Sequence, residues 1–464
     1  MQAKRTDDFI PGKGLSNQFS GLNTVEKRRQ WWVSLPNEWR KTLANIVLDK
    51  LRNIKNINDL EIQRILNAEE LLIYAEYDKR GRNKKMITDL SPLQYLTHLT
   101  SFQLSYHNPP SFRDFSKLSL LEDLNINNCE LSDLSGIETL YFLKELCLSE
   151  NKITDISPLG HLTQLEDLIL SYNEIKDLKP LSVLTSLDSL HVDNNKVEDL
   201  TPLSELSSLT YLNIAYNLIK SINPIKGMTA LNTIYASYNQ LKDTQYFDSF
   251  PDLATLDLSH NAIKSANGLS ELLHLSYLNL SNNPLKDTKP LGYLDDLETL
   301  LLSYTLISSL SSLSELTGLT TLDISHTQVK SLKGVEKLYN LNSLQCYSTQ
   351  IHDLNPLVYL NNLRMLYIGH NAITDISPLK KLENVETLSL IHVRIKDLSP
   401  LSHLENLRYL YLDNTDVESI EPIMQLDNLS YVSLNDTKVS AKELETFREK
   451  HPDCILSSSA EIEY

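Results

Sequence analysis

The 22 residues LKELCLSENKITDISPLGHLTQ, at positions 143–164, contain the pattern that decides the fold. Leu146 and Leu148 alternate with Glu145 and Cys147, so one side of this short stretch is more apolar than the other. Alternation with a period of two residues is typical of a β-strand with one buried face. We therefore predict a strand here with both leucines facing a core.

The second half of the same stretch reads as a turn followed by a short helical segment. Asn151 ends the strand, and its carboxamide can satisfy backbone groups that a buried turn hides from water. Ser157 and Pro158 predict the start of a helical turn, with the hydroxyl as its cap and proline in its first position. Leu159 and Leu162 then return to the core.

This unit occurs sixteen times without an insertion or deletion, and the first residues of the units run from Leu99 to Leu429 at intervals of 22 residues. Val385 is the only first residue that is not leucine. A single unit leaves two apolar edges open, and only stacked neighbours cover them. The pattern L-x-x-L-x-L-x-x-N at a fixed period is that of a leucine-rich repeat. We expect an α/β leucine-rich repeat solenoid, a horseshoe with a parallel β-sheet on its concave face and short 3-10 turns on its convex face.

One position of the unit distinguishes the coils. Counting the opening leucine as position 1, position 9 is asparagine in seven consecutive units and threonine in several later ones. A hydroxyl reaches fewer backbone groups than a carboxamide, so we expect the later coils to hold their turns less firmly. Val393 offers no hydrogen bond at this position and predicts a local adjustment. The threonines are Thr305, Thr327, Thr349, Thr415 and Thr437.

Both ends of the array need covering segments, because exposed terminal coils would aggregate. Before the array, the sequence predicts an amphipathic helix at 36–51 with Trp39, Leu43, Ile46 and Val47 on one face. Further predicted elements are a short helix at 59–66, a strand at 71–74 and, after the array, a helix through Lys450 that opens with the capping box Ser440-x-x-Glu443.

Trp31 and Trp32 are expected in the core of the N-terminal helical cap. The expected organisation of the whole chain has four parts. The parts are residues 1–24, a flexible N-terminus; 25–98, the helical cap and a partial first repeat; 99–439, the sixteen repeats; and 440–464, a cap helix and tail.

Charge is unevenly distributed along the chain, which has a net charge of −17. Residues 1–98 hold 17 basic and 12 acidic residues, and the remainder holds 26 basic and 48 acidic residues. An acidic solenoid repels phosphates and anionic lipids, so we expect neither nucleic acid nor membrane as a partner. The one basic cluster, Lys79 to Lys85, is either a solvated loop or a contact for a polyanion.

The chain contains no apolar run that resembles a signal peptide or could span a membrane, which favours a cytoplasmic location. Its four cysteines give no disulfide framework, and we expect four free thiols.

The outward positions of the strand half carry the functional argument. Positions 3, 5, 7 and 8 of sixteen units provide 64 side chains, none of which is lysine or arginine, while nine are acidic and 13 are tyrosine. Tyrosine offers a large rigid contact with a polar tip, and evolved binding surfaces favour it. We expect a partner-binding surface here, although tyrosine also suits exposed strands for structural reasons.

Two clusters are expected, several coils apart, and the expected ligand is a protein or peptide with basic residues that stack on tyrosine and pair with aspartate. The first cluster comprises Tyr211, Tyr216, Tyr235, Tyr238, Asp257, His260, Tyr277 and Tyr304. The second comprises Tyr347, Met365, Tyr367, His370, Ile391, His392, Tyr409, Tyr411 and Tyr431.

The unit L-x-x-L-x-L-x-x-N-x-I-x-D-[LI]-x-P-L-x-x-L-x-x is similar to the 22-residue repeats of bacterial internalins and of the related SDS22-like class, over about residues 87–439. This resemblance implies a curved solenoid with a parallel sheet inside and short helical turns outside. It also implies protein recognition on the concave aromatic face, at the tyrosines named above.

Other functions remain as alternatives to a binding scaffold. The SDS22-like resemblance suggests a regulatory subunit that docks on an enzyme such as a phosphatase, and the internalin resemblance a surface adhesin or invasin. No catalytic motif is found, so we expect no enzymatic activity and no cofactor. His370 and His392, followed by Asn414 and Asp436 in the same column, could hold Zn²⁺ loosely, but histidines of a protein interface are the favoured interpretation.

Overall fold

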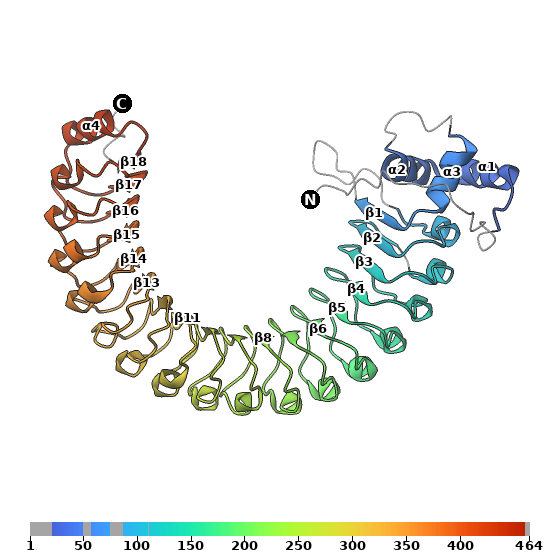
Figure 1. Cartoon of the computed structure of the whole chain (residues 1–464), viewed down its shortest axis with the longest axis horizontal. Coiled ribbons are helices and arrows are strands. Elements are labelled where there is room, and N and C mark those ends of the chain that lie inside the picture. The colour runs from blue at the N-terminus through green and yellow to red at the C-terminus, as the bar shows by residue number, and fades with distance from the viewer. Residues whose placement is uncertain (1–20, 50–56, 75–86, 110, 460–464) are drawn as a thin grey trace. The chain divides into compact units, whose positions relative to one another are not determined.

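The computed structural model describes residues 21–49, 57–74, 87–109 and 111–459, and the chain divides into two compact units, residues 1–195 and 196–464. The basic segment 79–85 and residues 1–20 of the expected flexible N-terminus lie outside the described residues. Figure 1 shows each unit as a succession of coils, in which every coil contributes a strand on one side and a tight turn on the other.

The described part of residues 1–195 contains six parallel strands that pair in chain order, with equivalent positions of neighbouring coils side by side, as Leu146 lies beside Leu168. The strands are β1 (Glu70–Tyr74), β2 (Ser101–Ser105), β3 (Asp123–Asn127), β4 (Glu145–Cys147), β5 (Asp167–Ile169) and β6 (Ser189–His191). Their 3-10 turns are η1 (Ser91–Tyr95), η2 (Arg113–Phe115), η3 (Ile137–Thr139), η4 (Ser157–His161) and η5 (Lys179–Val183).

Residues 196–464 repeat this arrangement with strands β7 to β18, again parallel and in register, as Leu278 beside Leu300 illustrates. The strands are β7 (Tyr211–Asn213), β8 (Thr233–Tyr235), β9 (Thr255–Asp257), β10 (Tyr277–Asn279), β11 (Thr299–Leu301), β12 (Thr321–Asp323), β13 (Ser343–Gln345), β14 (Met365–Tyr367), β15 (Thr387–Ser389), β16 (Tyr409–Tyr411), β17 (Tyr431–Ser433) and β18 (Ile455–Ser457). The 3-10 turns are η6 (Thr201–Leu203), η7 (Asn223–Ile225), η8 (Phe247–Ser249), η9 (Asn267–Leu269), η10 (Lys289–Tyr293), η11 (Ser311–Leu313), η12 (Asn355–Tyr359), η13 (Ser377–Lys381), η14 (Ser399–Leu401) and η15 (Glu421–Ile423).

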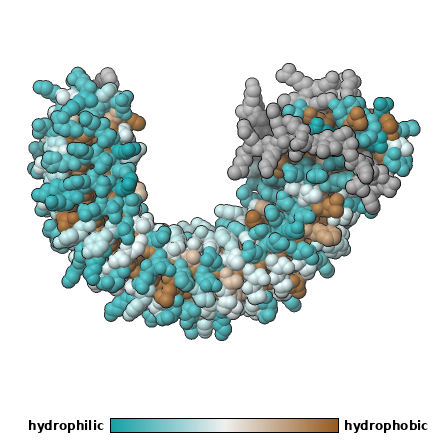
Figure 2. Space-filling view, viewed as in Figure 1, coloured by the Kyte–Doolittle hydropathy of each residue, from teal (hydrophilic) through white to brown (hydrophobic). Residues whose placement is uncertain are grey.

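The core is a stack of aliphatic layers that continues from coil to coil. In the unit that opens at Leu143, the side chains of Leu146, Leu148, Ile153 and Leu159 are at most 2% exposed, and the corresponding residues of the other units are buried as well. The visible surface is mainly hydrophilic, with isolated apolar patches (Figure 2). The parallel strands, the 3-10 turns and this layered core confirm the predicted leucine-rich repeat solenoid.

The 3-10 turns begin differently from the prediction. Ser157 is the first residue of η4 and its hydroxyl does not cap the turn, while Pro158 follows within the turn. The carboxylate of Asp155 accepts a hydrogen bond from the Ser157 N–H at 2.8 Å instead. The same geometry recurs at Asp199, and hydrogen bonds from Thr201 lower the pKa of that carboxyl group. The aspartate two residues before the turn is therefore the capping residue.

The position-9 side chains form the predicted hydrogen-bonded column. The Asn151 Oδ1 accepts hydrogen bonds from the backbone N–H groups of Cys129 and Leu131 on the preceding coil, both at 3.0 Å. Its Nδ2 donates to three backbone carbonyls at 2.8 to 3.1 Å. The Thr305 hydroxyl makes one bond, to the Leu302 carbonyl at 2.7 Å. A threonine therefore does satisfy fewer backbone groups at this position.

The coil of Val393 shows the expected local adjustment. The Ile395 N–H donates to the Val393 carbonyl at 2.9 Å, so this turn closes on itself. In the preceding coil, the Ala372 N–H donates to Ile351 of the coil before it at 3.1 Å. Within the described residues, the Arg394 N–H has no such bond. Replacing asparagine with valine has thus removed connections between neighbouring coils.

The described residues before the first strand form three helices, α1 (Val25–Ser34), α2 (Asn37–Leu48) and α3 (Asp59–Leu66); α2 contacts β1, and both α1 and α2 contact α3. The last two confirm the predicted helices, and Trp31 and Trp32 are buried as expected. Helix α1 was not predicted, because residues 26–29 are all charged and one of its three buried side chains is Arg28.

Helix α2 differs from its predicted face at one residue. Trp39 and Leu43 are buried, and the Trp39 indole donates to the Asp89 carbonyl at 2.8 Å. Ile46, however, is 37% exposed. The buried face is completed by Ala44, because Ile46 lies beyond the region that the neighbouring elements cover.

An almost buried ion pair joins α1 to α3. Arg28 donates from Nε and Nη2 to the two carboxylate oxygens of Asp59, each at 2.7 Å, and the two side chains are 9% and 19% exposed. The hydrogen bond from Arg28 lowers the pKa of Asp59.

We expect Asp59→Asn to destabilise this cap by about 2–4 kcal/mol, because it leaves the Arg28 guanidinium buried without its counter-charge. Since the pKa of Asp59 is lower in the folded than in the unfolded state, its contribution is present at neutral pH and is lost as the pH falls through the folded-state pKa. All three tryptophans lie in α1 and α2, so urea unfolding followed by tryptophan fluorescence reports on this region. An unchanged midpoint in the variant, or the same acid sensitivity in both proteins, would contradict the prediction.

The other end of the chain is covered by α4 (Ala441–Lys450) and by β18, which pairs in parallel with β17. The Ser440 hydroxyl caps α4 by accepting from the Glu443 N–H at 3.3 Å. The predicted capping box is only half formed, because the Glu443 carboxylate accepts instead from the Ile420 N–H at 2.7 Å and the Ser419 hydroxyl at 2.6 Å. These bonds hold the cap helix to the preceding coil.

Among the helices of the described residues, none combines the length and the apolar character needed to cross a membrane. The four cysteines are free, and Cys129 and Cys346 are buried. Burial raises the pKa of the Cys129 thiol to about 11, so this side chain stays protonated at neutral pH.

Candidate binding face

In residues 196–464, the strands lie on the inner side of this unit's bend and the 3-10 turns lie on its outer side (Figure 1). Side chains at positions 3 and 5 project from the sheet and form what we call the strand face. The expectation that position 7 belongs to it needs correction for the serines, because Ser237, Ser259 and Ser281 are at most 9% exposed, whereas Tyr347 at the same position is half-buried. The chain turns sharply at the next residue, so neighbouring coils cover these short side chains.

Position 8 has a left-handed backbone in all sixteen coils, with φ between 50° and 62°. This conformation costs roughly 1–2 kcal/mol for residues other than glycine, yet none of the sixteen is glycine and nine are tyrosine or histidine. Asparagine and histidine visit this region fairly often, but tyrosine is not explained by the backbone. The Tyr238 N–H donates to the Ser259 carbonyl of the next coil at 3.0 Å, which holds the backbone in this conformation.

The position-8 side chains of six consecutive coils form a column with two groups of stacked rings, and we call this column the ring ladder. Tyr238 stacks on Tyr216 at 4.0 Å between ring centroids and on His260 at 3.8 Å, each with an interplanar angle of 11°. Tyr304 and His326 stack at 4.1 Å with the same angle. The ring ladder consists of Tyr216, Tyr238, His260, Asn282, Tyr304 and His326.

The remaining members of the first predicted cluster lie together on the strand face. The rings of Tyr211 and Tyr235 are 5.8 Å apart. Burial raises the pKa of Tyr277, and the charge of Asp257 and the proximity of Tyr235 raise it further. This cluster therefore combines a half-buried strand-face patch with the exposed rings of the ladder.

The second predicted cluster also contains a compact tyrosine group. Tyr411 and Tyr431 are 5.4 Å apart. Burial raises the pKa of Tyr411, and Tyr367, Tyr431 and Tyr409 contribute to the increase in that order. Met365 is 36% exposed at the edge of this group.

The two clusters are connected, contrary to the expectation that several coils separate them. The ring of His326 is 4.1 Å from Tyr304 and 5.6 Å from Tyr347, and Tyr347 is 4.7 Å from His370. His370 in turn lies 4.0 Å from His392. The sequence analysis missed His326, although it stands exactly one repeat after Tyr304 and could have been found by reading the position-8 column on its own.

Negative charge on the outward positions is unopposed. Within the described residues, none of the nine outward carboxylates pairs with a lysine or arginine side chain. Some of them accept internal hydrogen bonds: Asp257 accepts from the Ser259 N–H at 2.8 Å, and Asp413 accepts from the Asn435 N–H at 2.7 Å. These bonds orient the carboxylates and leave their charge in place.

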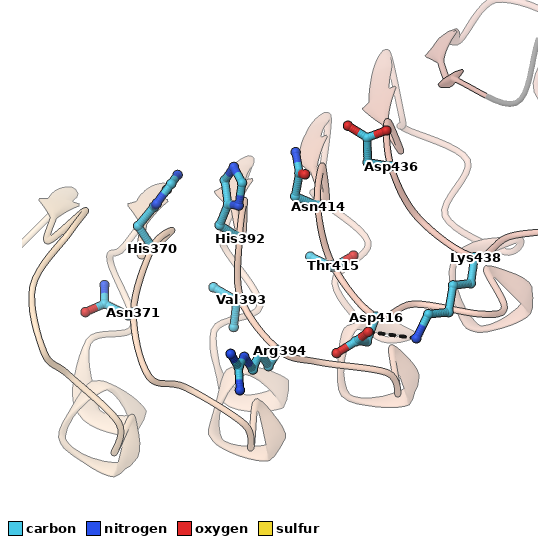
Figure 3. Close-up of a pocket in the computed structure, with 10 residues that line it drawn as sticks. All are labelled: His370, Asn371, His392, Val393, Arg394, Asn414, Thr415, Asp416, Asp436 and Lys438. Atoms are coloured by element: carbon cyan, nitrogen blue, oxygen red, sulfur yellow. Dashed lines mark hydrogen bonds and ion pairs between the residues drawn. The ribbon is translucent and has the colours of Figure 1, made fainter. Parts of the chain in front are cut away.

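The column that the sequence analysis considered for zinc borders an open hollow of about 600 Å³. Figure 3 shows His370, His392, Asn414 and Asp436 in a row on successive coils, while Lys438 pairs with Asp416 behind them at 2.8 Å. In the described part of the chain, no three histidine, cysteine or carboxylate side chains converge as a metal site would require. Burial lowers the pKa of His370, and the nearby His392 and His326 lower it further.

Several segments of the repeat array match known protein families. A family described as "Leucine Rich repeats (2 copies)" matches residues 163–205 and 361–403. A second family, "Leucine rich repeat", matches residues 185–241, and a third, "Leucine Rich Repeat", matches residues 274–294. These matches cover parts of the repeat array and agree with the leucine-rich repeat fold of the chain. No curated protein matches its sequence.

Solved structures with the same fold include an internalin, another bacterial protein and a plant receptor. An internalin of Listeria monocytogenes is 25% identical with a TM-score of 0.50, and the match covers 85% of this chain and 94% of that one. A leucine-rich repeat protein of Leptospira interrogans is 23% identical with a TM-score of 0.66, covering 80% and 92%. The Arabidopsis receptor kinase HAESA, solved with the peptide hormone IDA and the co-receptor SERK1, is 18% identical with a TM-score of 0.62, covering 91% and 78%.

Proposed function

We propose that residues 196–464 bind an extended basic segment of a protein or peptide along the strand face and the ring ladder. The observation that carries this proposal is the set of aromatic rings at left-handed positions, where glycine would cost least. The core does not need these rings, since Tyr216, Tyr238 and Tyr304 are 46%, 40% and 54% exposed. A surface that accepts a backbone cost to present rigid aromatic groups fits recognition of a partner.

The charge of this surface supports a basic ligand. Its strand face presents Asp257 and Asp323 without a cationic side chain at any of the outward positions. Exposed aromatic faces attract lysine and arginine, and unopposed carboxylates raise the rate at which such a ligand associates. HAESA was solved with a peptide hormone. That example supports the idea that this fold can receive a peptide.

A display library of random peptides tests the proposal with the full chain as the target. We expect the selected peptides to be enriched in arginine and lysine, and their affinity to fall about tenfold between about 50 mM and 500 mM salt. Selection of neutral or acidic peptides, or affinities that do not change with salt, would overturn the basic character of the ligand.

A further inference from the structure

The ring ladder is interrupted at one place, and this interruption has the form of a slot. His260 ends one group of stacked rings and Tyr304 begins the next, with Asn282 between them. Rings on adjacent coils of the ladder are 3.8 to 4.1 Å apart, so two coils separate the flanking rings by roughly 8 Å. A planar group that stacks on both rings at these distances requires the same separation. The interruption therefore has the width of one planar group above the short side chain of Asn282.

Asn282 supplies polar groups at the base of the slot. Its side chain is half-buried, and within the described residues its carboxamide makes no hydrogen bond. Two of the three other asparagines at position 8 are engaged: Asn128 donates to Glu150 at 2.6 Å, and Asn194 donates to Asp193 at 2.9 Å. The Asn282 oxygen is thus available to a hydrogen-bond donor from outside the chain.

The surroundings of the slot favour a cation. The position-10 residues of these three coils are Ala262, Pro284 and Leu306, none of which carries a charge. On the strand-face side, Asp257 belongs to the same coil as His260 and has no cationic partner in the described residues. A positive group in the slot would meet aromatic faces and, on the strand-face side, an unopposed carboxylate.

We propose that the slot between His260 and Tyr304 receives the guanidinium group of one arginine of the ligand. This inference rests on the proposed function of this face. A guanidinium is planar, stacks on aromatic rings on both of its sides and has five N–H donors, one of which meets the Asn282 oxygen. A lysine ammonium is not planar and cannot fill the space between two rings. The slot therefore distinguishes arginine from lysine, which charge attraction alone does not.

The test uses three short synthetic peptides, acetyl-Gly-Ser-Arg-Ser-Gly-amide and its lysine and citrulline counterparts, titrated into the full chain and followed by NMR chemical shifts. We expect the arginine peptide to bind at least tenfold more tightly than either counterpart. Citrulline keeps the planar shape without the charge, and lysine keeps the charge without the planar shape.

Asn282→Tyr closes the slot, because a ring at this position would continue the stack, and tyrosine already occupies the same left-handed position at residue 304. We expect this variant to lose the arginine preference. Asn414→Tyr, the same substitution at position 8 of another coil, is the matched control and should bind as the wild type does.

Equal affinity of the arginine and lysine peptides, no detectable binding of the arginine peptide, or an unchanged arginine preference in Asn282→Tyr would each overturn the slot. These failures differ from a failure of the proposed function. If Asn282→Tyr has no effect but peptides selected from the library still depend on the strand-face tyrosines, then the slot is wrong and the binding face stands.

Discussion

Replacing Asn283 with alanine is expected to destabilise the protein by about 3–5 kcal/mol, because the Ile263 N–H and the Leu258 and Leu280 carbonyls each lose a hydrogen bond in a buried place. The Asn283 side chain is 2% exposed. Its Oδ1 accepts from the Ile263 N–H at 2.9 Å, and its Nδ2 donates to three carbonyls, of Leu258, Leu280 and Ser281, at 2.9 to 3.3 Å. Alanine fills neither role, and the position is closed to bulk water.

The next coil provides a matched control for this prediction. Thr305 occupies the same position and is also 2% exposed, but it makes a single hydrogen bond, to the Leu302 carbonyl. We expect Thr305→Ala to cost about 1 kcal/mol. Urea unfolding followed by circular dichroism compares the two variants, and exchange of the Ile263 amide hydrogen reports the local effect. Equal losses of stability would contradict the idea that the number of bonds at position 9 determines how firmly a turn is held.

Simultaneous replacement of Tyr235, Tyr238 and Tyr277 with alanine is expected to weaken binding of a library-selected peptide by at least about 100-fold. Tyr238 stands between Tyr216 and His260 in the ring ladder, so its removal takes away contact area and leaves its neighbours without a stacking partner. Tyr235 and Tyr277 are half-buried on the strand face. Partly buried tyrosines that keep one face accessible are typical of residues that dominate a binding energy.

A second triple variant controls for the loss of three tyrosines. Tyr293, Tyr339 and Tyr359 are 64%, 54% and 57% exposed, and they lie on the turn side of coils in the same unit. Their replacement with alanine should leave peptide affinity unchanged within about twofold. If both triple variants bind like the wild type, or both lose binding equally, the strand face and ring ladder are not the binding surface.

Much of the fold could be predicted because every contact in a solenoid is made with a neighbouring coil. The period of 22 residues fixes which residues stack, so the buried layer of Leu146 and Leu148 follows from spacing alone. The role of Asn151 and the disturbance at Val393 follow as well, because each depends only on how many hydrogen bonds a side chain can offer. Helix α1 could not be recognised, since its burial depends on helices that pack on it from elsewhere in the chain.

The sequence by itself determined the repeat, its buried positions and the tyrosine-rich, cation-free character of the outward ones. Only the tertiary structure decided how those outward residues are divided: Ser259 is covered, Tyr277 is half-buried on the sheet, and Tyr238 lies in a stack. The physical reason is the left-handed backbone at position 8, which redirects the side chain out of the alternation of the strand. Spacing cannot reveal that turn, and without it neither the ring ladder nor its interruption at Asn282 can be recognised.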